Sequence, residues 1–162
     1  MRHWLGVVSH EHVRRGVELG FAQANHGKRN LLARMRRGDW LVYYSSRERI
    51  RDGAQVHAFT AIGQVADDEP WQADEGRLSP SGASGDFVRE SCPRPWRRRV
   101  QYDRTASIVP IAALRERLDL ASGPHWGIQL RRGLIELGED DFRLIHGAMV
   151  LGSTGQALGK AG

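Results

Sequence analysis

The spacing of apolar and polar positions predicts short strands that alternate with short helices along the chain. Compact runs of aromatic and β-branched residues are typical of strands. Such runs cover residues 3–8, 40–45, 56–65, 96–103 and 134–137. Apolar residues at three- and four-residue intervals predict helices over residues 10–19, 30–35, 110–118 and 139–149. This order of elements indicates an α+β domain built around a small curved sheet.

Three residues predict particular backbone features: the end of one helix, a bulge or close approach between strands, and the start of another helix. Gly20 is placed to end the helix 10–19 in the left-handed conformation. Gly63, inside the strand 56–65, indicates a bulge or a close approach of another strand. Pro110 suits the first turn of a helix, because its fixed φ and missing N–H are tolerated there.

The strand predicted over residues 96–103 is rich in arginine. Successive side chains of a strand point to opposite faces. One face therefore takes Trp96, Arg98, Val100 and Tyr102, and the other takes Arg97, Arg99, Gln101 and Asp103. We expect Arg97 and Arg99 to act together through their charge.

The chain of 162 residues is long enough for one domain with its own core. Residues 72–95 are dominated by Gly, Ser, Pro and charged residues, so they bury too little apolar surface to offset the entropy of ordering. We expect a long mobile loop there. The sequence therefore predicts one domain over residues 1–150, followed by a frayed tail over 151–162.

The chain is basic, with 24 Lys and Arg against 19 Asp and Glu and a net charge of +5. All of these cations except Lys28 and Lys160 are arginines. Codon bias in a GC-rich genome explains such an excess, and so does phosphate binding, because the planar guanidinium pairs well with oxyanions. The clustering of the arginines, as at Arg131 and Arg132, favours some phosphate contact.

Composition excludes several protein classes. Hydrophobic residues make up 40% of the chain, which is too many for a disordered protein, and no apolar run approaches the length of a membrane span. The single cysteine, Cys92, excludes an internal disulfide. No secretory signal is apparent at the start of the chain. We therefore expect a cytoplasmic protein without a membrane partner.

No catalytic or cofactor motif stands out in the sequence. Ser9 and Ser45 follow strands, but neither lies in a Gly-x-Ser-x-Gly turn. His10 and His12 are two residues apart on a predicted helix and so point in different directions. The sequence thus predicts no enzyme activity, no metal site and no cofactor.

The stretch from residue 21 to 28 gathers aromatic, amide, imidazole and cationic groups in one short loop. Its members are Phe21, Gln23, Asn25, His26 and Lys28. One interpretation is a solvated connection whose polar groups bond to nearby backbone. The other is a pocket wall that stacks a flat ring and hydrogen-bonds to its edge, since amides donate and accept side by side. Trp96, followed directly by three arginines, combines stacking and phosphate contact in the same way.

Taken in order, these segments resemble the EVE domain family over about residues 2–150. The resemblance rests on His3-Trp4-Leu5-x-Val7-Val8-Ser9, Gly20-Phe21-x-Gln23-x-Asn25-His26-Gly27-Lys28, Leu32-x-Arg34-Met35-x-x-Gly38-Asp39, Val42-Tyr43-Tyr44-Ser45, Phe59-Thr60-Ala61-Ile62-Gly63-x-Val65, Arg97-Arg98-Arg99-Val100, Trp126-Gly127 and Asp141-Phe142-Arg143-Leu144-Ile145. It implies a PUA-like fold, a small curved β-barrel with flanking helices, similar to YTH and ASCH domains that bind RNA and to readers of modified DNA bases.

The resemblance also implies a pocket for a modified base. Its expected members are Ser9, Phe21, Gln23, Asn25, His26, Tyr44, Ser45 and Trp96. Phe21 and Trp96 would stack the base from two sides. Gln23, Asn25 and the backbone around Ser9 and His26 would bond to its edge. Phosphates would be held by Lys28, Arg97, Arg99, Arg131 and Arg132.

Three functions are consistent with these features. The first is a non-catalytic reader of 5-methylcytosine in DNA that flips the base into the aromatic pocket. The second is an RNA-binding module that recognises a modified or single-stranded base and contacts a 2′-hydroxyl. The third is a small nucleotide hydrolase, which the missing nucleophile and metal motifs disfavour. The sequence leaves open whether a separate nuclease acts as a partner.

Overall fold

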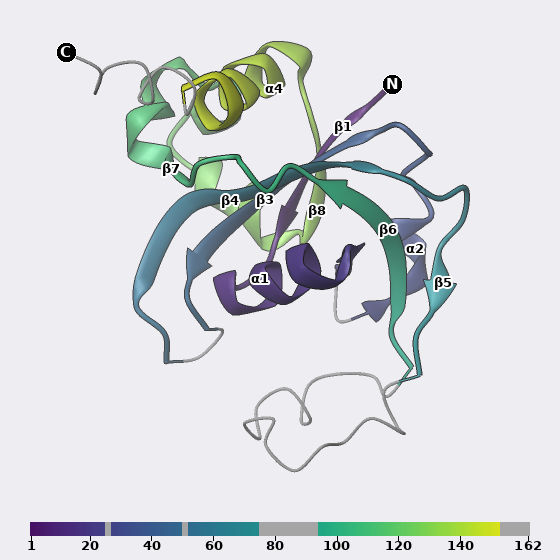
Figure 1. Cartoon of the computed structure of the whole chain (residues 1–162). Coiled ribbons are helices and arrows are strands. Elements are labelled where there is room, and N and C mark those ends of the chain that lie inside the picture. The colour runs from purple at the N-terminus through teal and green to yellow at the C-terminus, as the bar shows by residue number, and fades with distance from the viewer. Residues whose placement is uncertain (25–26, 50–51, 75–93, 153–162) are drawn as a thin grey trace, which may run out of the picture.

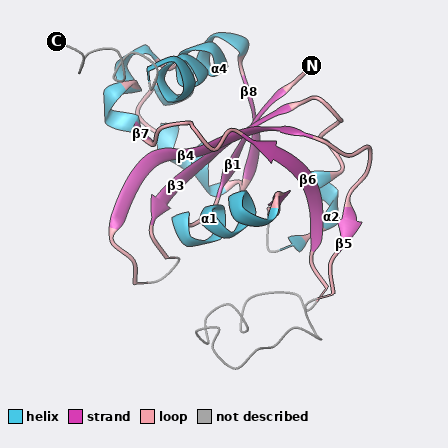
Figure 2. Ribbon diagram, in the orientation of Figure 1, coloured by secondary structure: helices cyan, strands magenta, loops and turns pink. Residues whose placement is uncertain are grey.

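The computed structural model describes residues 1–24, 27–49, 52–74 and 94–152. A strongly curved sheet forms the body of the molecule, and helix α1 (His10–Leu19) lies inside its curve (Figure 1). Helix α4 (Glu139–His146) packs outside the sheet, at the opposite end from α1 (Figure 2). This arrangement is the α+β, curved-sheet fold that the sequence predicts.

The main path of the sheet runs in the order β2-β6-β4-β3-β1-β8. The strands are β1 (His3–Val7), β2 (Phe21–Ala22), β3 (Trp40–Arg47), β4 (Gln55–Val65), β6 (Trp96–Tyr102) and β8 (Leu134–Leu137). β1 runs parallel to β3, and the other neighbours are antiparallel. Two short strands complete the sheet: β5 (Trp71–Gln72) pairs with β6, and β7 (Val109–Pro110) pairs with β4. All five predicted strands are confirmed to within a few residues.

Helix α1 ends where the sequence predicts. Gly20 has φ 74° and ψ 34°, and its N–H bonds to the carbonyl of Gly16. This left-handed residue turns the chain directly into β2, because glycine adopts a positive φ without a steric penalty. The turn therefore fixes Phe21, the first residue of β2, close to the end of α1.

Two hydrophobic clusters lie on opposite faces of the sheet. The cluster inside the curve joins α1, the short helix α2 (Arg29–Leu32) and the strands, through residues that include Trp4, Val13, Leu32, Tyr43 and Val100. The cluster outside the curve joins α4 and the preceding turns to the sheet, through residues that include Leu5, Tyr44, Phe59, Phe142 and Ile145. A side chain's cluster therefore tells which face of the sheet it occupies.

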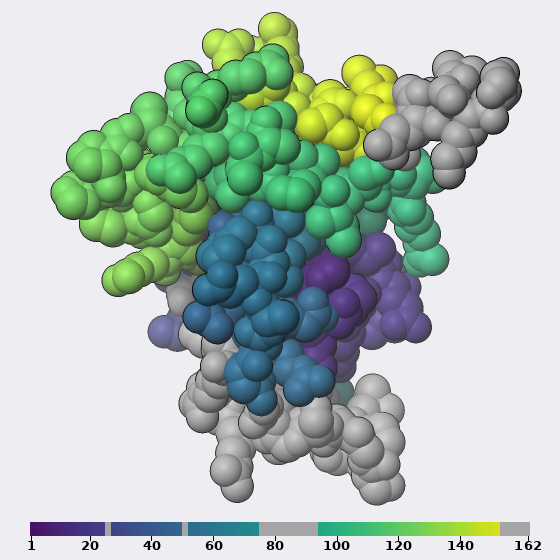
Figure 3. Space-filling model, turned by 90° about the vertical axis from the view of Figure 1, so that its left-hand side faces the viewer, coloured from purple at the N-terminus to yellow at the C-terminus, as the bar shows by residue number. Residues whose placement is uncertain are grey.

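The helix predicted from Pro110 is wrong. Pro110 ends β7, and three separate 3-10 turns follow: Ile111–Ala113, Arg115–Arg117 and Asp119–Ala121. Ile111, Leu114 and Leu118 are nevertheless buried in the outer cluster. The apolar spacing thus identifies the buried positions, while the short 3-10 turns wrap the segment over the sheet. In the space-filling view this green segment covers the blue strands below it (Figure 3).

The last predicted helix forms, with a change at its end. After α4 the chain continues as a π-helical turn, Gly147–Leu151. Phe142, Ile145 and Met149 are buried against the outer face of the sheet, as their spacing predicts. Three acidic residues, Glu139, Asp140 and Asp141, occupy the first turn of α4, where they complement the helix dipole.

Gly63 lies where β4 and β6 come closest. A Cβ at this position would lie 2.6 Å from the carbonyl oxygen of Gln101 and 2.8 Å from the Cα of Tyr102. We expect Gly63→Ala to destabilise the protein by about 1–3 kcal/mol, because backbone must move to admit the methyl group. Thermal melting beside Gly127→Ala, whose Cβ would meet nothing within 4 Å, checks this. Equal melting temperatures for the two variants would contradict it.

The long segment that starts at residue 72 begins and ends on paired strands. Trp71 pairs with Arg97 and Gln72 pairs with Trp96, so the chain leaves and rejoins the sheet at one place. Most of the predicted mobile loop, residues 75–93, lies outside the described residues. The tail predicted over residues 151–162 is described only to Gly152.

Candidate nucleic-acid interface

Phe21 lies in a compact group of side chains at the free edge of the sheet. It pairs with Arg99 across β2 and β6, which places the side chain of Arg97 diagonally opposite on the same face. The guanidinium carbon of Arg97 lies 3.9 Å from the centre of the Phe21 ring. His12 of α1 meets the ring edge-on at 6.3 Å. Phe21 is 3% exposed, so its ring is enclosed by charged and polar neighbours and not by the main cores.

Gln23 is fixed to its surroundings at three points. Its backbone N–H donates to the hydroxyl of Tyr43, and that hydroxyl donates back to the Gln23 carbonyl, both at 3.1 Å. Its side-chain Oε1 accepts a hydrogen bond of 3.2 Å from Nε of Arg97. Burial raises the pKa of Tyr43 to about 12, so its hydroxyl keeps the proton that it donates. The Phe21, Arg97 and Gln23 side chains form one unit, which we call the edge cluster.

The structure does not bring Trp96 opposite Phe21. Side chains alternate along β6, so Trp96 shares a face with Arg98, while Arg97 and Phe21 share the other face. Trp96 packs against the inner hydrophobic cluster, with Arg29 5.5 Å above its ring. The structure therefore places the two residues expected to stack the base on opposite faces of β6 and does not bring them together.

The three consecutive arginines of β6 have three different environments. Arg97 is buried in the edge cluster, and Arg99 is exposed. Arg98 is fully buried, with its Nε bonded to the carboxylate of Asp67 at 2.6 Å. Arg97 and Arg99 share a face of β6, as predicted, but the structure gives them different surroundings, because Arg97 packs against Phe21.

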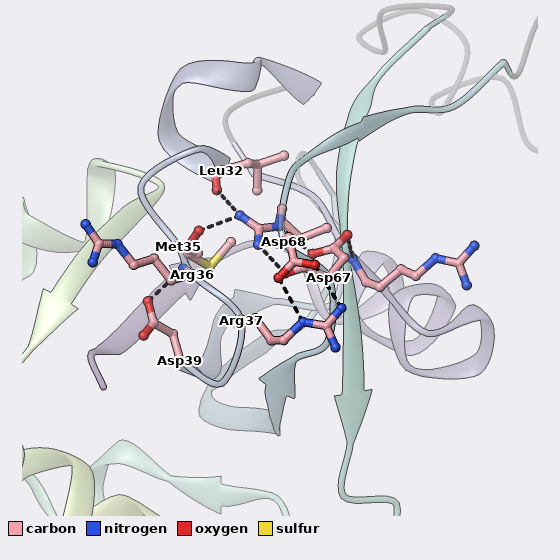
Figure 4. A network of polar contacts seen from close by, with 9 residues as sticks. Leu32, Met35, Arg36, Arg37, Asp39, Asp67 and Asp68 are labelled. Carbon is pink, nitrogen blue, oxygen red and sulfur yellow. Dashed lines mark hydrogen bonds and ion pairs between the residues drawn. The ribbon is translucent and has the colours of Figure 1, made fainter.

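Asp67 and Arg98 form the centre of a polar network that ties α2 to β6 (Figure 4). Besides the carboxylate, the Arg98 guanidinium bonds to the carbonyls of Leu32, Met35 and Asp67. The second carboxylate oxygen of Asp67 accepts the backbone N–H of Arg99 at 2.7 Å. Every contact in this network is internal to the fold, so Arg98 has a structural role.

A buried carboxylate, Asp39, anchors the start of the chain. Burial pushes its pKa upward, but hydrogen bonds from the backbone N–H groups of Arg2 and Arg36 and from the Trp4 indole outweigh burial. The pKa of Asp39 is consequently held below its ordinary value. The carboxylate is fully engaged and does not belong to a binding site.

The other expected pocket members are spread over the barrel. Tyr44 belongs to the outer cluster and bonds to Nδ1 of His57 at 3.2 Å, so it lies on the opposite face from Tyr43. Ser45 is fully buried, and its hydroxyl pairs with that of Thr60 at 2.9 Å. Ser9 is half-buried and precedes α1 without a side-chain capping bond. The structure therefore does not bring Tyr44 together with Phe21 and Gln23, and Ser45 is already engaged within the fold.

The remaining expected site residues are either exposed or outside the described residues. Lys28 is exposed at the start of α2, and Arg131 and Arg132 are exposed beside the 3-10 turn Trp126–Arg131. Asn25 and His26 lie outside the described residues.

Tyr43, His12 and Asp67 take part in these arrangements but are not among the expected pocket or phosphate-binding residues. Tyr43 stands beside Tyr44 in a strand, and only the alternation of faces distinguishes the two. Asp67 follows β4 in an ordinary turn. His12 is two residues from His10, and the spacing argues only against a shared metal. No group of three or more His, Cys, Asp or Glu side chains that could hold a metal occurs within the described ranges.

Known proteins match this chain over nearly its whole length. The family model of the EVE domain matches residues 2–148. A UPF0310 protein of Renibacterium salmoninarum is 44% identical over 146 residues, which are 90% of this chain and 94% of that protein. The chain belongs to the EVE domain family. A UPF0310 protein of Mycolicibacterium gilvum is 41% identical to this EVE domain, over 93% of this chain and 97% of that protein.

Solved structures show the same fold. Rpa0253 from Rhodopseudomonas palustris matches with a TM-score of 0.56 at 19% identity, over 93% of this chain and 94% of that one. A hypothetical protein from Leishmania major matches with a TM-score of 0.56 at 14% identity, over 97% of each chain. Human THYN1, solved in complex with DNA containing 5-methylcytosine, is also found, at a TM-score of 0.47 and 15% identity over 90% of this chain and 95% of that one. That likeness is too low to say what the present EVE domain binds.

These findings establish the PUA-like, α+β architecture of the EVE domain. Membership in the family supports a nucleic-acid-binding module and is consistent with a protein that is not an enzyme. Within the described residues, no helix is both long and apolar enough to span a membrane.

The Tyr43 hydroxyl gives a direct test of how the EVE domain holds Gln23. We expect Tyr43→Phe to destabilise the protein by about 1–3 kcal/mol, because it strips partners from the buried N–H and carbonyl of Gln23. The aromatic ring keeps its packing, so the loss comes from the hydroxyl alone. Urea unfolding measures the loss of stability. The control is Tyr44→Phe, which loses only a partly exposed hydrogen bond to His57. A Tyr43→Phe variant as stable as the parent would contradict the assignment.

Proposed function

We propose that this EVE domain is a non-catalytic nucleic-acid-binding module that takes a modified base of DNA, 5-methylcytosine, into a pocket at the edge cluster. The observation that carries the proposal is the buried unit of Phe21, Arg97 and Gln23, in which a flat ring and a fixed amide lie together at the free edge of the sheet. This combination suits a flat ligand with hydrogen-bonding groups on its rim.

The proposal is energetically reasonable. Extruding a base from a duplex costs a few kcal/mol, and stacking on an aromatic ring returns ~1–3 kcal/mol. A buried methyl group contributes a further ~0.8 kcal/mol. Discrimination by the methyl alone is consequently modest, and the rest of the affinity must come from the edge of the base and from phosphates.

Exposed cations lie close to both faces of β6. Lys28 and Arg29 begin α2, and Arg99 pairs with Phe21 across the strands. Each phosphate contact from such residues would make binding weaker as salt increases, without adding preference for a base. Arg131 and Arg132 lie on a separate element, after the outer 3-10 turns, and would contact phosphates further along the duplex.

The test is a set of equilibrium titrations of the whole chain against matched duplexes. The duplexes are identical except for one cytosine or adenine, which is unmodified or carries 5-methylcytosine, 5-hydroxymethylcytosine or N6-methyladenine. The proposal predicts tightest binding to the 5-methylcytosine duplex. Tighter binding to a matching RNA would favour an RNA-binding module, and equal binding to all DNA would contradict base reading. Turnover of any nucleotide would contradict a non-catalytic role.

A further inference from the structure

The contact between Gln23 and Arg97 fixes the direction of the Gln23 amide. A guanidinium carries only hydrogen-bond donors, so the atom of Gln23 that faces Nε of Arg97 must be the oxygen. The amide nitrogen then points the other way. It lies beside Gly27, where a Cβ would come within 3.7 Å of it. The orientation follows from donor and acceptor chemistry and not from a choice between two similar atoms.

That amide nitrogen has no partner among the residues described. The hydrogen bonds of Gln23 use its backbone N–H, its backbone carbonyl and its side-chain oxygen, and none uses Nε2. Yet Gln23 is only 7% exposed. The nitrogen is not one of the fully buried side-chain atoms that lack a partner in the described residues, so it keeps some contact with solvent. A donor in such a position takes its acceptor from water or from a ligand. The nitrogen is therefore placed to receive an acceptor atom from outside the described fold.

We infer that Gln23 reads the bound base as a hydrogen-bond donor and that Arg97 positions it for this task. The inference rests on the proposed function and specifies its chemistry. The ligand edge must present an acceptor, as the O2 and N3 atoms of 5-methylcytosine do. Cytosine presents the same two atoms, so this bond bears on the preference because the modified base is the one proposed to leave the stack and enter the pocket. Arg97 serves by holding the amide oxygen and by packing its guanidinium against one face of the Phe21 ring.

This role differs from phosphate binding, for which the neighbouring arginine is the better candidate. Arg97 is 7% exposed and places its guanidinium flat on an aromatic ring. Arg99 is exposed, and its hydrogen bonds within the described residues use its backbone: the N–H donates to Asp67 and the carbonyl accepts from the N–H of Ala66. The two arginines thus provide an internal comparison within one strand: one tests positioning and the other tests charge.

Three variants separate these roles. Arg97→Lys keeps the charge but loses the planar group and the Nε–H that holds Gln23. Gln23→Glu keeps an acceptor for Arg97 but removes the NH₂ donor. Arg99→Ala removes an exposed charge and is the matched control. Each is titrated against the 5-methylcytosine duplex and its unmodified counterpart over a range of salt concentrations, with thermal melting to confirm folding.

We expect Arg97→Lys and Gln23→Glu each to reduce the preference for the modified duplex, by roughly 3- to 10-fold in affinity, with an unchanged salt slope. Arg99→Ala should weaken binding to both duplexes equally and reduce the salt slope by about one. Should Arg97→Lys or Gln23→Glu fail to fold, Gln23→Leu, which fills the same space without a donor, takes its place. A Gln23 variant that keeps the full preference overturns the inference, as does an Arg97→Lys variant that behaves like the parent.

Failure of the proposed function gives a different result. If the parent protein does not prefer any modified duplex, base reading itself is wrong, and the inference falls with it. If the parent prefers the modified duplex and Gln23→Glu leaves that preference intact, only the inference is wrong. The parent titration therefore tests the proposed function, and the Gln23→Glu titration then tests the inference.

Discussion

Replacing Asp67 with alanine is expected to destabilise this EVE domain by about 3–5 kcal/mol. The variant leaves the guanidinium of Arg98 buried without its counter-charge, and Arg98 is 0% exposed. Three backbone carbonyls still accept from Arg98, so the loss should lie towards the lower end of that range. Thermal melting should show a fall in Tm on the order of 10 °C.

The neighbouring residue provides the matched control. Asp68 pairs with Arg37, but both side chains are largely exposed, so solvent screens the pair. Asp68→Ala should leave the melting temperature nearly unchanged. The account is wrong if the two alanine variants melt together, because the buried pair would then add no more to stability than an exposed one.

Replacing Phe21 with leucine is expected to reduce affinity for the 5-methylcytosine duplex by ~1–3 kcal/mol, the value of one base–aromatic stack. Leucine nearly fills the space of the ring but offers no flat surface to a base or to the guanidinium of Arg97. Alanine is unsuitable, because deleting a buried phenyl costs ~3–5 kcal/mol of stability by itself. Equilibrium titration beside thermal melting separates the two effects.

Trp96→Leu is the control for Phe21→Leu. Trp96 lies on the other face of β6 with the inner cluster, so this variant should lower stability while the ratio of affinities for modified and unmodified duplexes stays the same. The reverse result, with Trp96→Leu abolishing the preference and Phe21→Leu retaining it, would place the pocket on the inner face of the strand.

Much of the fold follows from the sequence because burial on the two faces of a sheet leaves a regular pattern. The strand periodicity predicts β1, β3, β4, β6 and β8, and the glycine after residue 19 ends α1 as expected. The segment after Pro110 is different. Its apolar residues have helical spacing and are buried, but a 3-10 turn places every third residue on one side, so the same spacing fits both structures.

The site is less predictable, because the roles of its polar residues depend on partners far away in the chain. The sequence identifies Phe21 and Gln23 from the concentration of flat and amide groups in one loop. The sequence does not show that Arg97 and Arg98 have different environments. Arg97 contacts Phe21 and Arg98 contacts Asp67, and both partners come from distant parts of the chain. Asp39 is similar: its three donors include an N–H only three residues away, yet its burial depends on β1.

The most direct measurement of the central claim uses a duplex in which the methyl group of one 5-methylcytosine is labelled with ¹³C. In the complex with the whole chain, an NMR experiment filtered on that methyl detects the protons within a few ångströms of it. A base held in the edge cluster should show contacts from the methyl to the aromatic protons of Phe21. Contacts only to the neighbouring bases of the duplex would mean that the base stays stacked, and would contradict the proposed pocket.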